Sequence, residues 1–365
     1  MTENKLWFKV ARNIIKAGKL PIQVTDTLYE LIRLLISKDE AQFLLIFNKK
    51  PNLNLDEIKA KTDLNENSLI SMLENLMNKG IISGNPSKTT GQMIYHLMSP
   101  FPGIFELQLM KGESGEKQIK LAKLFDKLFH EWSLGTQKNY DLIVQQYRNI
   151  PSIDRVIPIE QEIELKDEIV LPLEEINKII DKYDDIALAF CYCRQEKELL
   201  NDPCKINAPK HNCFMFGKNA QFLIVHGFAK PISKEKAKKI MQEAEDFGLV
   251  HKAFHIHQDI ERDEEAICNC CNCCCGVFQL HKKGVTPFYT TTSYIVDYDV
   301  DMCVGCGTCV DKCPLETIEM EDSKIIINKD NCIGCGVCVH NCPEKALKLN
   351  RTGLRSVFIL PPKLT

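Results

Sequence analysis

Apolar residues in the first hundred positions recur three and four places apart, which is the period of amphipathic helices. Residues 25–47 show this spacing, and Asn54 and Asn65 each stand where a helix cap is expected before another apolar stripe. Residues 81–97 hold a Gly-Asn-Pro turn signal between two short apolar runs. The pattern predicts helices followed by a hairpin as one domain, residues 1–98.

Residues 99–170 are predicted to form a helical connector. Helix-breaking residues crowd 99–115 and mark a domain boundary. One face of the following helix is apolar, and its members are Leu121, Leu124, Phe125, Leu128, Phe129 and Trp132. A stripe of this width is typical of a packing face.

Short apolar runs in residues 171–295 indicate buried strands that alternate with helices. The predicted strands are Ile186–Phe190, Phe222–Val225 and Leu249–His257, and the predicted helices run from Pro172 through Tyr183 and onward from the cap Ser233. We expect an α/β unit here, and we expect the whole chain to be an α+β multidomain protein.

Cysteine usage is the unusual feature of the composition. The 365 residues contain 18 cysteines, all between Cys191 and Cys342, whereas the net charge of −3 is ordinary and shows no basic excess for nucleic acid. No stretch is apolar enough for a membrane span or a signal peptide, so we expect a cytoplasmic protein with reduced thiols. Closely spaced cysteines in such a protein indicate metal binding.

Two copies of the spacing C-x₂-C-x₂-C-x₃-C-P lie near the C-terminus. Residues 296–350, which contain them, resemble a bacterial-type ferredoxin with two [4Fe-4S] clusters, and 351–365 would be a tail. The resemblance implies that one cluster is held by Cys303, Cys306, Cys309 and Cys342, and the other by Cys332, Cys335, Cys338 and Cys313. The segment has ten Asp and Glu against five Lys and Arg, a charge of −5. This charge predicts a redox partner protein with a basic docking surface.

The other ten cysteines lie on predicted strand ends and loops of the middle region. They are Cys191, Cys193, Cys204, Cys213, Cys268, Cys270, Cys271, Cys273, Cys274 and Cys275. Thiolates select zinc, copper(I) or iron–sulfur clusters, and a cubane takes four, so the ten suffice for one or two further iron–sulfur clusters. Zinc is the alternative, although Cys-x-Cys and consecutive cysteines depart from its usual ligand spacing.

Backbone geometry predicts how these thiols group. In extended chain Cys191 and Cys193 point to the same side, at the exit of a strand. If the run 268–275 is also extended, one face carries Cys268, Cys270 and Cys274, and the other carries Cys271, Cys273 and Cys275. Such a run could serve two metal centres.

Two weaker resemblances concern the same region. Cys274-Cys275-Gly276 is similar to the Cys-Cys-Gly motif of heterodisulfide reductase catalytic subunits, but it occurs here once and within a denser run. The combined pattern resembles iron–sulfur proteins of anaerobes that are described only as 4Fe-4S binding proteins. Neither resemblance implies a substrate.

Residues 25–98 resemble a winged helix-turn-helix. The recognition segment, residues 63–80, holds three acidic residues against Lys79, and the hairpin adds only Lys88. A helix that binds in the DNA major groove needs Arg and Lys side chains to contact phosphates and base edges. We therefore expect a scaffold or docking role and no nucleic-acid partner.

Three functions follow from the sequence. The leading one is an iron–sulfur electron-transfer protein, a component of an anaerobic, low-potential oxidoreductase system. The second is an oxidoreductase with a catalytic cluster in the middle region, for which no nucleotide or flavin fingerprint is present. The third is a redox-sensing DNA-binding regulator.

Overall fold

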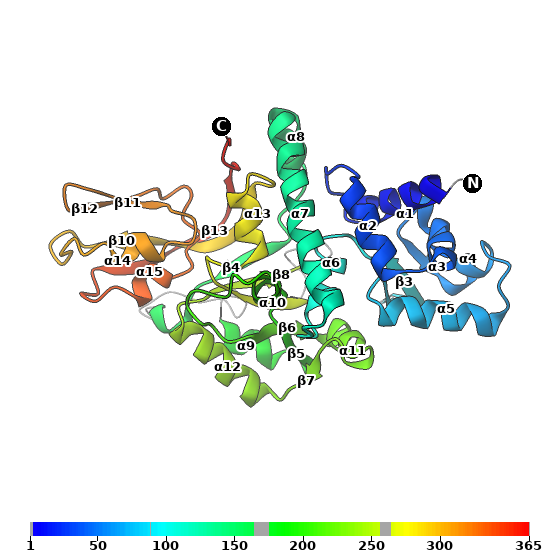
Figure 1. Cartoon of the computed structure of the whole chain (residues 1–365). Coiled ribbons are helices and arrows are strands. Elements are labelled where there is room, and N and C mark those ends of the chain that lie inside the picture. Colours follow the sequence, from blue (N-terminus) through cyan, green and yellow to red (C-terminus); the bar gives the residue numbers. More distant parts are fainter. Residues whose placement is uncertain (1–2, 88, 164–174, 256–263, 365) are drawn as a thin grey trace.

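The computed structural model describes residues 3–87, 89–163, 175–255 and 264–364. Three parts lie side by side (Figure 1): a mostly helical N-terminal unit, a central sheet flanked by helices, and a small C-terminal unit at the opposite end. This mixture of helices and several sheets agrees with the expected α+β class. Within the described ranges, no helix is both long and apolar enough to cross a membrane.

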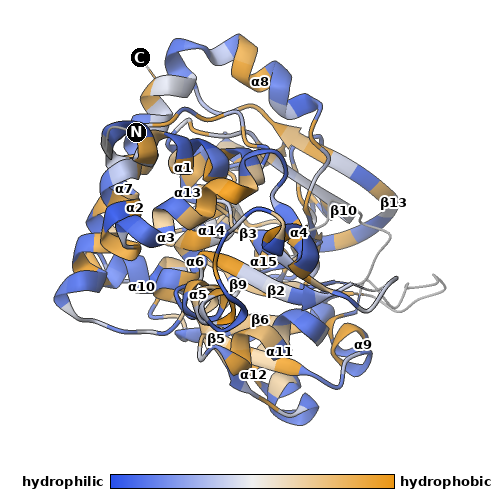
Figure 2. Cartoon of the chain, turned by 90° about the vertical axis from the view of Figure 1, so that its right-hand side faces the viewer, coloured by the Kyte–Doolittle hydropathy of each residue, from blue (hydrophilic) through white to orange (hydrophobic). Residues whose placement is uncertain are grey.

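Short helices and a three-stranded sheet build the N-terminal unit. Asn54 caps α4 by accepting the Glu57 amide at 2.9 Å, and Asn65 caps α5 by accepting the Ser68 amide at 3.0 Å. Apolar and polar residues alternate along these helices (Figure 2), as packing on one face requires. The helices are α1 (Glu3–Ala17), α2 (Asp26–Leu35), α3 (Lys38–Phe43), η1 (Leu44–Asn48), α4 (Leu55–Lys59) and α5 (Glu66–Asn78). The strands pair in the order β1 (Asn52–Asn54), β3 (Met93–Leu97), β2 (Ile82–Pro86).

An eight-stranded mixed sheet forms the centre of the molecule. Its order is β13-β10-β4-β8-β9-β6-β5-β7, and neighbours run antiparallel except β10 and β4. The strands are β4 (Asp154–Ile157), β5 (Ile186–Phe190), β6 (His211–Phe216), β7 (Lys230–Pro231), β8 (Val250–Phe254), β9 (Ala266–Cys270), β10 (Phe288–Tyr298) and β13 (Leu347–Ile359).

The two faces of this sheet have different partners, because side chains alternate along each strand. Phe214 and Ile267 face a core with α9 (Ile176–Asp181) and α12 (Lys234–Asp246). Their sequence neighbours Cys213 and Cys268 face the opposite, larger core. The helices on that side are α6 (Ile104–Leu109), α7 (Glu116–Lys138), α10 (Tyr192–Leu199) and α13 (Gly276–Lys282).

Aromatic rings join the helices of the larger core. Phe105 of α6 is fully buried and packs edge-to-face against Phe125, Phe129 and Tyr192, with ring centroids 4.8, 5.2 and 5.6 Å away. The apolar stripe predicted for 121–132 is buried along α7, which extends into α8 (Tyr140–Arg148). The stripe is therefore a packing face.

One predicted strand of the middle region is wrong. Residues 222–225 form the end of helix α11 (Gly217–Val225), where Phe222 and Leu223 are buried while Val225 is 77% exposed. Burial on one side only is the pattern of a helix. The strand lies immediately before it, at β6, whose polar residues interrupt the apolar pattern. Ile186–Phe190 does form β5, whereas Pro172 and His257 lie outside the described residues, as does Lys88.

The predicted domain limits also need correction. Residues 351–365 are no free tail, because 351–359 complete β13, which pairs with β10 from Leu347↔Tyr298 to Ile359↔Phe288. The limits at 295 and 350 therefore cut through two long strands. The connector is not wholly helical either, since its residues 154–157 supply β4.

The C-terminal unit is an insertion between β10 and β13. It contains α14 (Thr308–Lys312), the hairpin β11 (Ile318–Glu321) and β12 (Lys324–Ile327), and α15 (Val337–His340). The outer ends of β10 and β13 continue into it (Figure 1), so the same two strands belong to the central sheet and to this unit.

We predict that deleting residues 351–365 lowers the apparent melting temperature by at least about 5 °C, because it removes all of β13 beyond Asn350, most of the strand, and uncovers the buried Phe288. Deleting only 363–365, which lie beyond the strand, should change it by less than about 2 °C. Thermal unfolding under anaerobic conditions measures both. If the two deletions lowered the melting temperature equally, β13 would contribute little to the stability of the fold.

Candidate metal centres

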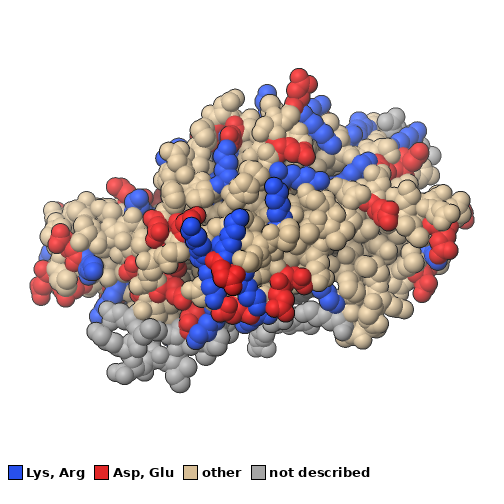
Figure 3. Space-filling model, turned by 90° about the horizontal axis from the view of Figure 1, so that it is seen from below, with Lys and Arg blue, Asp and Glu red and all other residues tan. Residues whose placement is uncertain are grey.

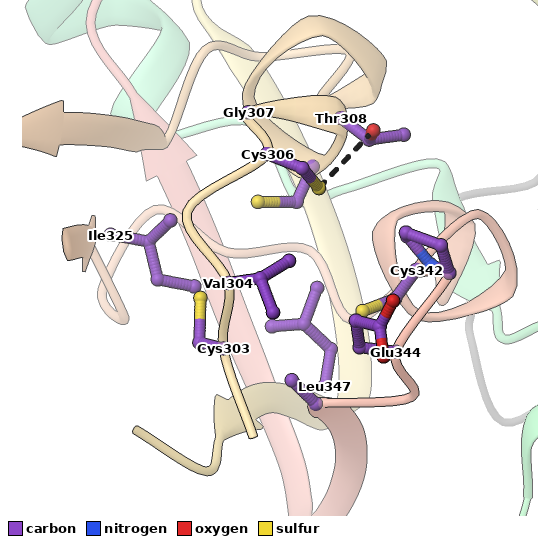
Figure 4. A pocket seen from close by; sticks show the side chains of 12 residues that line it. Cys303, Val304, Cys306, Gly307, Thr308, Ile325, Cys342, Glu344 and Leu347 are labelled. Carbon is purple, nitrogen blue, oxygen red and sulfur yellow. Dashed lines mark hydrogen bonds between the residues drawn. The ribbon is translucent and has the colours of Figure 1, made fainter. Parts of the chain in front are cut away.

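Four cysteines line a pocket at the far end of the C-terminal unit, here called the outer pocket. They are Cys303, Cys306, Cys309 and Cys342. Figure 4 shows the sulfurs of the labelled cysteines around one space beside Val304 and Leu347. Cys306 is exposed and hydrogen-bonds Thr308 Oγ1 at 3.5 Å, whereas Cys309 is buried. The outer pocket therefore reaches solvent on one side.

A second, inner pocket lies on the side of the central sheet, and its cysteines are Cys313, Cys332, Cys335 and Cys338. All four are buried. Burial raises the pKa of Cys335 and of Cys338, so thiolates form here only with a compensating cation such as a bound metal. Each pocket takes three cysteines from one motif and the fourth from the other, the grouping that the ferredoxin resemblance implies.

Glycines let the backbone pass close to both pockets. Gly307 and Gly336 precede α14 and α15 with φ of 78° and 79°, a left-handed conformation that glycine adopts without strain. The Gly334 amide lies 3.4 Å from Cys332 Sγ, and a Cβ on this glycine would come within 2.3 Å of the Tyr294 carbonyl oxygen. Backbone amides can therefore donate to sulfur, which stabilises thiolate ligands.

Comparison with known proteins identifies this part of the chain. A family model described as the 4Fe-4S dicluster domain matches residues 295–343. The C-terminal unit is a ferredoxin-type domain. Over 33 residues, or 9% of the chain, it is 48% identical to Ferredoxin-2 of Desulfomicrobium norvegicum, and the match spans 56% of that protein's length. No solved structure matches the chain.

Six of the remaining ten thiols gather within the larger core and form what we call the six-thiol centre. Hydrogen-bonded sulfur contacts link them in the order Cys268, Cys213, Cys191, Cys193, Cys275, Cys270. All six are buried. The Gly276 amide donates to Cys193 Sγ at 3.0 Å, and the Tyr192 hydroxyl lies 4.0 Å from Cys268 Sγ. One enclosed set of thiols therefore connects β6, β9 and the N-termini of α10 and α13.

The other four thiols form a separate set, the four-thiol site, made of Cys204, Cys271, Cys273 and Cys274. Three of them come from the turn between β9 and α13, and Cys204 comes from the loop after α10. Cys204 and Cys273 are half-buried, whereas the other two are buried. The two sets are continuous in sequence, since Cys270 precedes Cys271 and Cys274 precedes Cys275.

The expected division of the run 268–275 into two faces is wrong in part. Cys268 and Cys270 share one face, as alternation on β9 requires, and Cys271 and Cys273 belong together. Cys274 instead lies with Cys271 and Cys273, and Cys275 lies with Cys270. The reason is that the chain turns after Cys270, so that Cys275 becomes the N-cap of α13. Cys191 and Cys193 do lie together, although Cys193 is already in α10.

Two buried cations face these thiols, and the sequence analysis missed both. Arg194 is 2% exposed and donates to the carbonyl oxygens of Pro209 and Asn269, both at 3.0 Å. Among the described residues, the charges that act most strongly on Arg194 are those of cysteines, with no carboxylate among them. Burial lowers the pKa of Arg194, but the charges of Cys191, Cys271 and Cys204 outweigh it and raise the pKa. Arg194 therefore serves both thiol sets.

Lys252 is the second cation. Its side chain is fully buried, with Nζ 3.0 Å from Asp154 Oδ2 and 4.5 Å from the ring centre of Phe288. Burial lowers the pKa of Lys252, but the charges of Asp154, Cys275 and Cys270 outweigh this effect, so the pKa is raised overall. The sequence did offer a signal for this site, because Lys252 lies in the middle of a predicted buried strand and a buried charge needs a partner of opposite charge.

The cations show which protonation state suits the thiols. A buried guanidinium without a counter-charge is strongly unfavourable, and neutral thiols supply none. Thiolates bound to a metal would supply the missing negative charge. The buried Arg194 is therefore compatible with metal ligation by the thiols around it.

We predict that Arg194→Met weakens metal retention in the middle region and destabilises the fold by about 3–5 kcal/mol, as removal of one partner from a buried pair does. Anaerobic urea unfolding and iron release to a chelator measure the two effects. Arg12→Met on α1, an exposed position, is the matched control. If Arg194→Met instead stabilised the protein, the thiols would be protonated and unligated.

Proposed function

We propose that the protein is an iron–sulfur electron-transfer protein, a component of an anaerobic, low-potential oxidoreductase system in the reducing cytoplasm. Two [4Fe-4S] clusters in the outer and inner pockets and at least one iron–sulfur cluster at the six-thiol centre supply one-electron redox chemistry. The ligands are the four cysteines of each pocket and members of the six-thiol set.

The observation that carries the proposal is the graded burial of the three sites. Cys306 of the outer pocket is exposed, all four cysteines of the inner pocket are buried, and the six-thiol centre is buried in the larger core. Cys335 of the inner pocket belongs to the same core as Cys270 and Cys275. The Ile159 amide, just after β4, donates to the Cys335 carbonyl at 3.2 Å. The sites thus follow one another from the surface to the interior.

Charge at the exposed end suits a redox partner with a basic surface. The ferredoxin-type domain carries the excess of acidic residues counted above, and Figure 3 shows acidic side chains at that end of the molecule, on the left. Complementary charge speeds the encounter of electron-transfer partners, and salt weakens it.

A catalytic role for the six-thiol centre is the second candidate, and one observation favours it. Six thiolates exceed the four that a cubane needs, so two remain for chemistry at the same place. Against it, Phe101 and Tyr192 pack over the centre, with the Phe101 ring 3.6 Å from a Cβ placed on Gly276. A substrate would have to displace these rings.

The structure adds no support for the third hypothesis, a redox-sensing DNA-binding regulator. Lys79, the cation of segment 63–80, pairs at 2.5 Å with the buried Glu40. Lys59 pairs with Glu66 at the start of α5. These pairs occupy cations that phosphate binding would require.

We predict about 12 iron and 12 acid-labile sulfide per chain in protein purified without oxygen, falling by about 4 each in a Cys191→Ser/Cys193→Ser variant. The variant should keep the electron paramagnetic resonance signals of the ferredoxin-type domain. Chemical analysis of both proteins makes the test. About 8 iron in both would remove the third redox centre and the proposal with it.

A second prediction concerns the route of the electrons. In a Cys335→Ser variant, a reduced ferredoxin as external donor should reduce the outer site normally but the six-thiol centre at least tenfold more slowly. Freeze-quench electron paramagnetic resonance resolves the two. Ile326→Ala, a 48% exposed position on β12, serves as control and should leave both rates unchanged. Unchanged reduction of the six-thiol centre in Cys335→Ser would show that electrons bypass the inner pocket.

A further inference from the structure

The four-thiol site differs in geometry from every other group of cysteines in the molecule. Among the described residues, it is the set of potential metal-binding side chains whose ligand atoms all lie within 4.8 Å of one another. Cys204 Sγ lies 3.8 Å from Cys271 Sγ and 3.7 Å from Cys273 Sγ. Cys273 Sγ lies 3.6 Å from the sulfurs of both Cys271 and Cys274.

These distances are those of a tetrahedron around one ion. Zinc binds thiolate sulfur at about 2.3 Å, and the edge of a regular tetrahedron is about 1.6 times that bond, so four sulfurs around zinc are separated by about 3.8 Å. A cubane instead binds each thiolate at a different iron corner, which spreads the sulfurs farther apart. The outer and inner pockets show this wider arrangement, since neither set of four falls within 4.8 Å.

We propose that Cys204, Cys271, Cys273 and Cys274 bind one zinc ion. Tetrahedral coordination by four sulfurs is typical of zinc, and four protein ligands leave no open position for a substrate. The site is therefore structural, separate from the redox centres, and it does not depend on the function proposed above.

Local structure explains how cysteines with this unusual spacing meet. The chain turns sharply after β9, with the Cys275 amide donating to the Cys271 carbonyl at 3.1 Å, so three ligands within four residues converge. Gln279 Nε2 holds the turn by donating to the Asn272 carbonyl at 3.0 Å. Opposite it, the Lys205 amide donates to Cys273. Backbone donors of this kind stabilise thiolates bound to a metal.

Charge and packing complete the site. Four thiolates around a divalent ion carry a net charge of −2, and the Arg194 guanidinium lies in hydrogen-bonding contact with Cys271. Ala208, Ala244 and Leu249 pack around Cys271 and Cys274 and exclude water from one side.

The position of the ion gives it a role. It ties the loop that follows α10 to the turn before α13, and the first turn of α10 carries Cys193 while Cys275 caps α13. Zinc therefore holds together the walls of the redox site.

The test measures metals in the full-length protein, expressed in iron-replete medium and purified without oxygen. We expect about one zinc per chain, and X-ray absorption at the zinc edge should show four sulfur ligands at about 2.3 Å. This measurement on the unmodified protein does not depend on any variant folding.

Paired variants then assign the ion. Cys204→Ser and Cys273→Ser should lose zinc and keep all iron and sulfide, whereas Cys193→Ser should lose about 4 iron and keep zinc. Loss of iron together with sulfide from Cys204→Ser would place a cluster at the four-thiol site and overturn the proposal. One iron without zinc or sulfide, or zinc bound by nitrogen or oxygen, would overturn it equally. Only about 8 iron in the unmodified protein would contradict the proposed function alone, whereas iron retained by Cys193→Ser would exclude Cys193 as a cluster ligand and leave the zinc assignment intact.

Discussion

The charge of buried thiolates is the constraint on which the rest of the structure depends. Ten cysteines from separate stretches of the chain gather in the two thiol sets, and eight of them are buried. Free thiols could pack there as small apolar groups, but the Arg194 guanidinium places a full positive charge in the same interior. Lys252 is balanced by Asp154 at 3.0 Å, whereas the counter-charge of Arg194 would come from the metal-bound thiolates that we propose.

The long strands β10 and β13 join the ferredoxin-type domain to the central sheet, which carries the proposed electron acceptor. The ferredoxin-type domain is not attached by a flexible linker. Both of its outer strands run on into the central sheet, where they pair along ten positions from Leu347↔Tyr298 to Ile359↔Phe288. His340 adds a contact to Glu162 at 3.0 Å on the other side. Because Cys335 of the inner pocket also belongs to the larger core that contains Cys270 and Cys275, the strands and this core hold the two proposed redox sites in one folded body.

The proposed zinc site and the six-thiol centre divide the work of one short segment. Residues 271, 273 and 274 fix the turn, and residues 268, 270 and 275 line the redox site on either side of it. Structural zinc has no redox chemistry of its own, so it can brace the turn while the neighbouring centre changes charge. The aromatic rings of Phe105 and Tyr192 close the opposite side and keep water away.

The sequence by itself determined the ferredoxin-type domain and the caps of the N-terminal helices, because in both cases the chemistry depends on neighbours in the chain. Cysteines spaced by two residues wrap one cluster locally, and Asn54 caps the helix that starts beside it. Only the tertiary structure decided how the ten middle cysteines divide. That division depends on a turn after Cys270, on Cys204 and Cys213 arriving from distant segments, and on which face of the sheet each strand presents. Long-range packing also placed residues 351–359 in a strand beside β10 and oriented Arg194 toward Pro209 and Asn269, because these partners are distant in sequence.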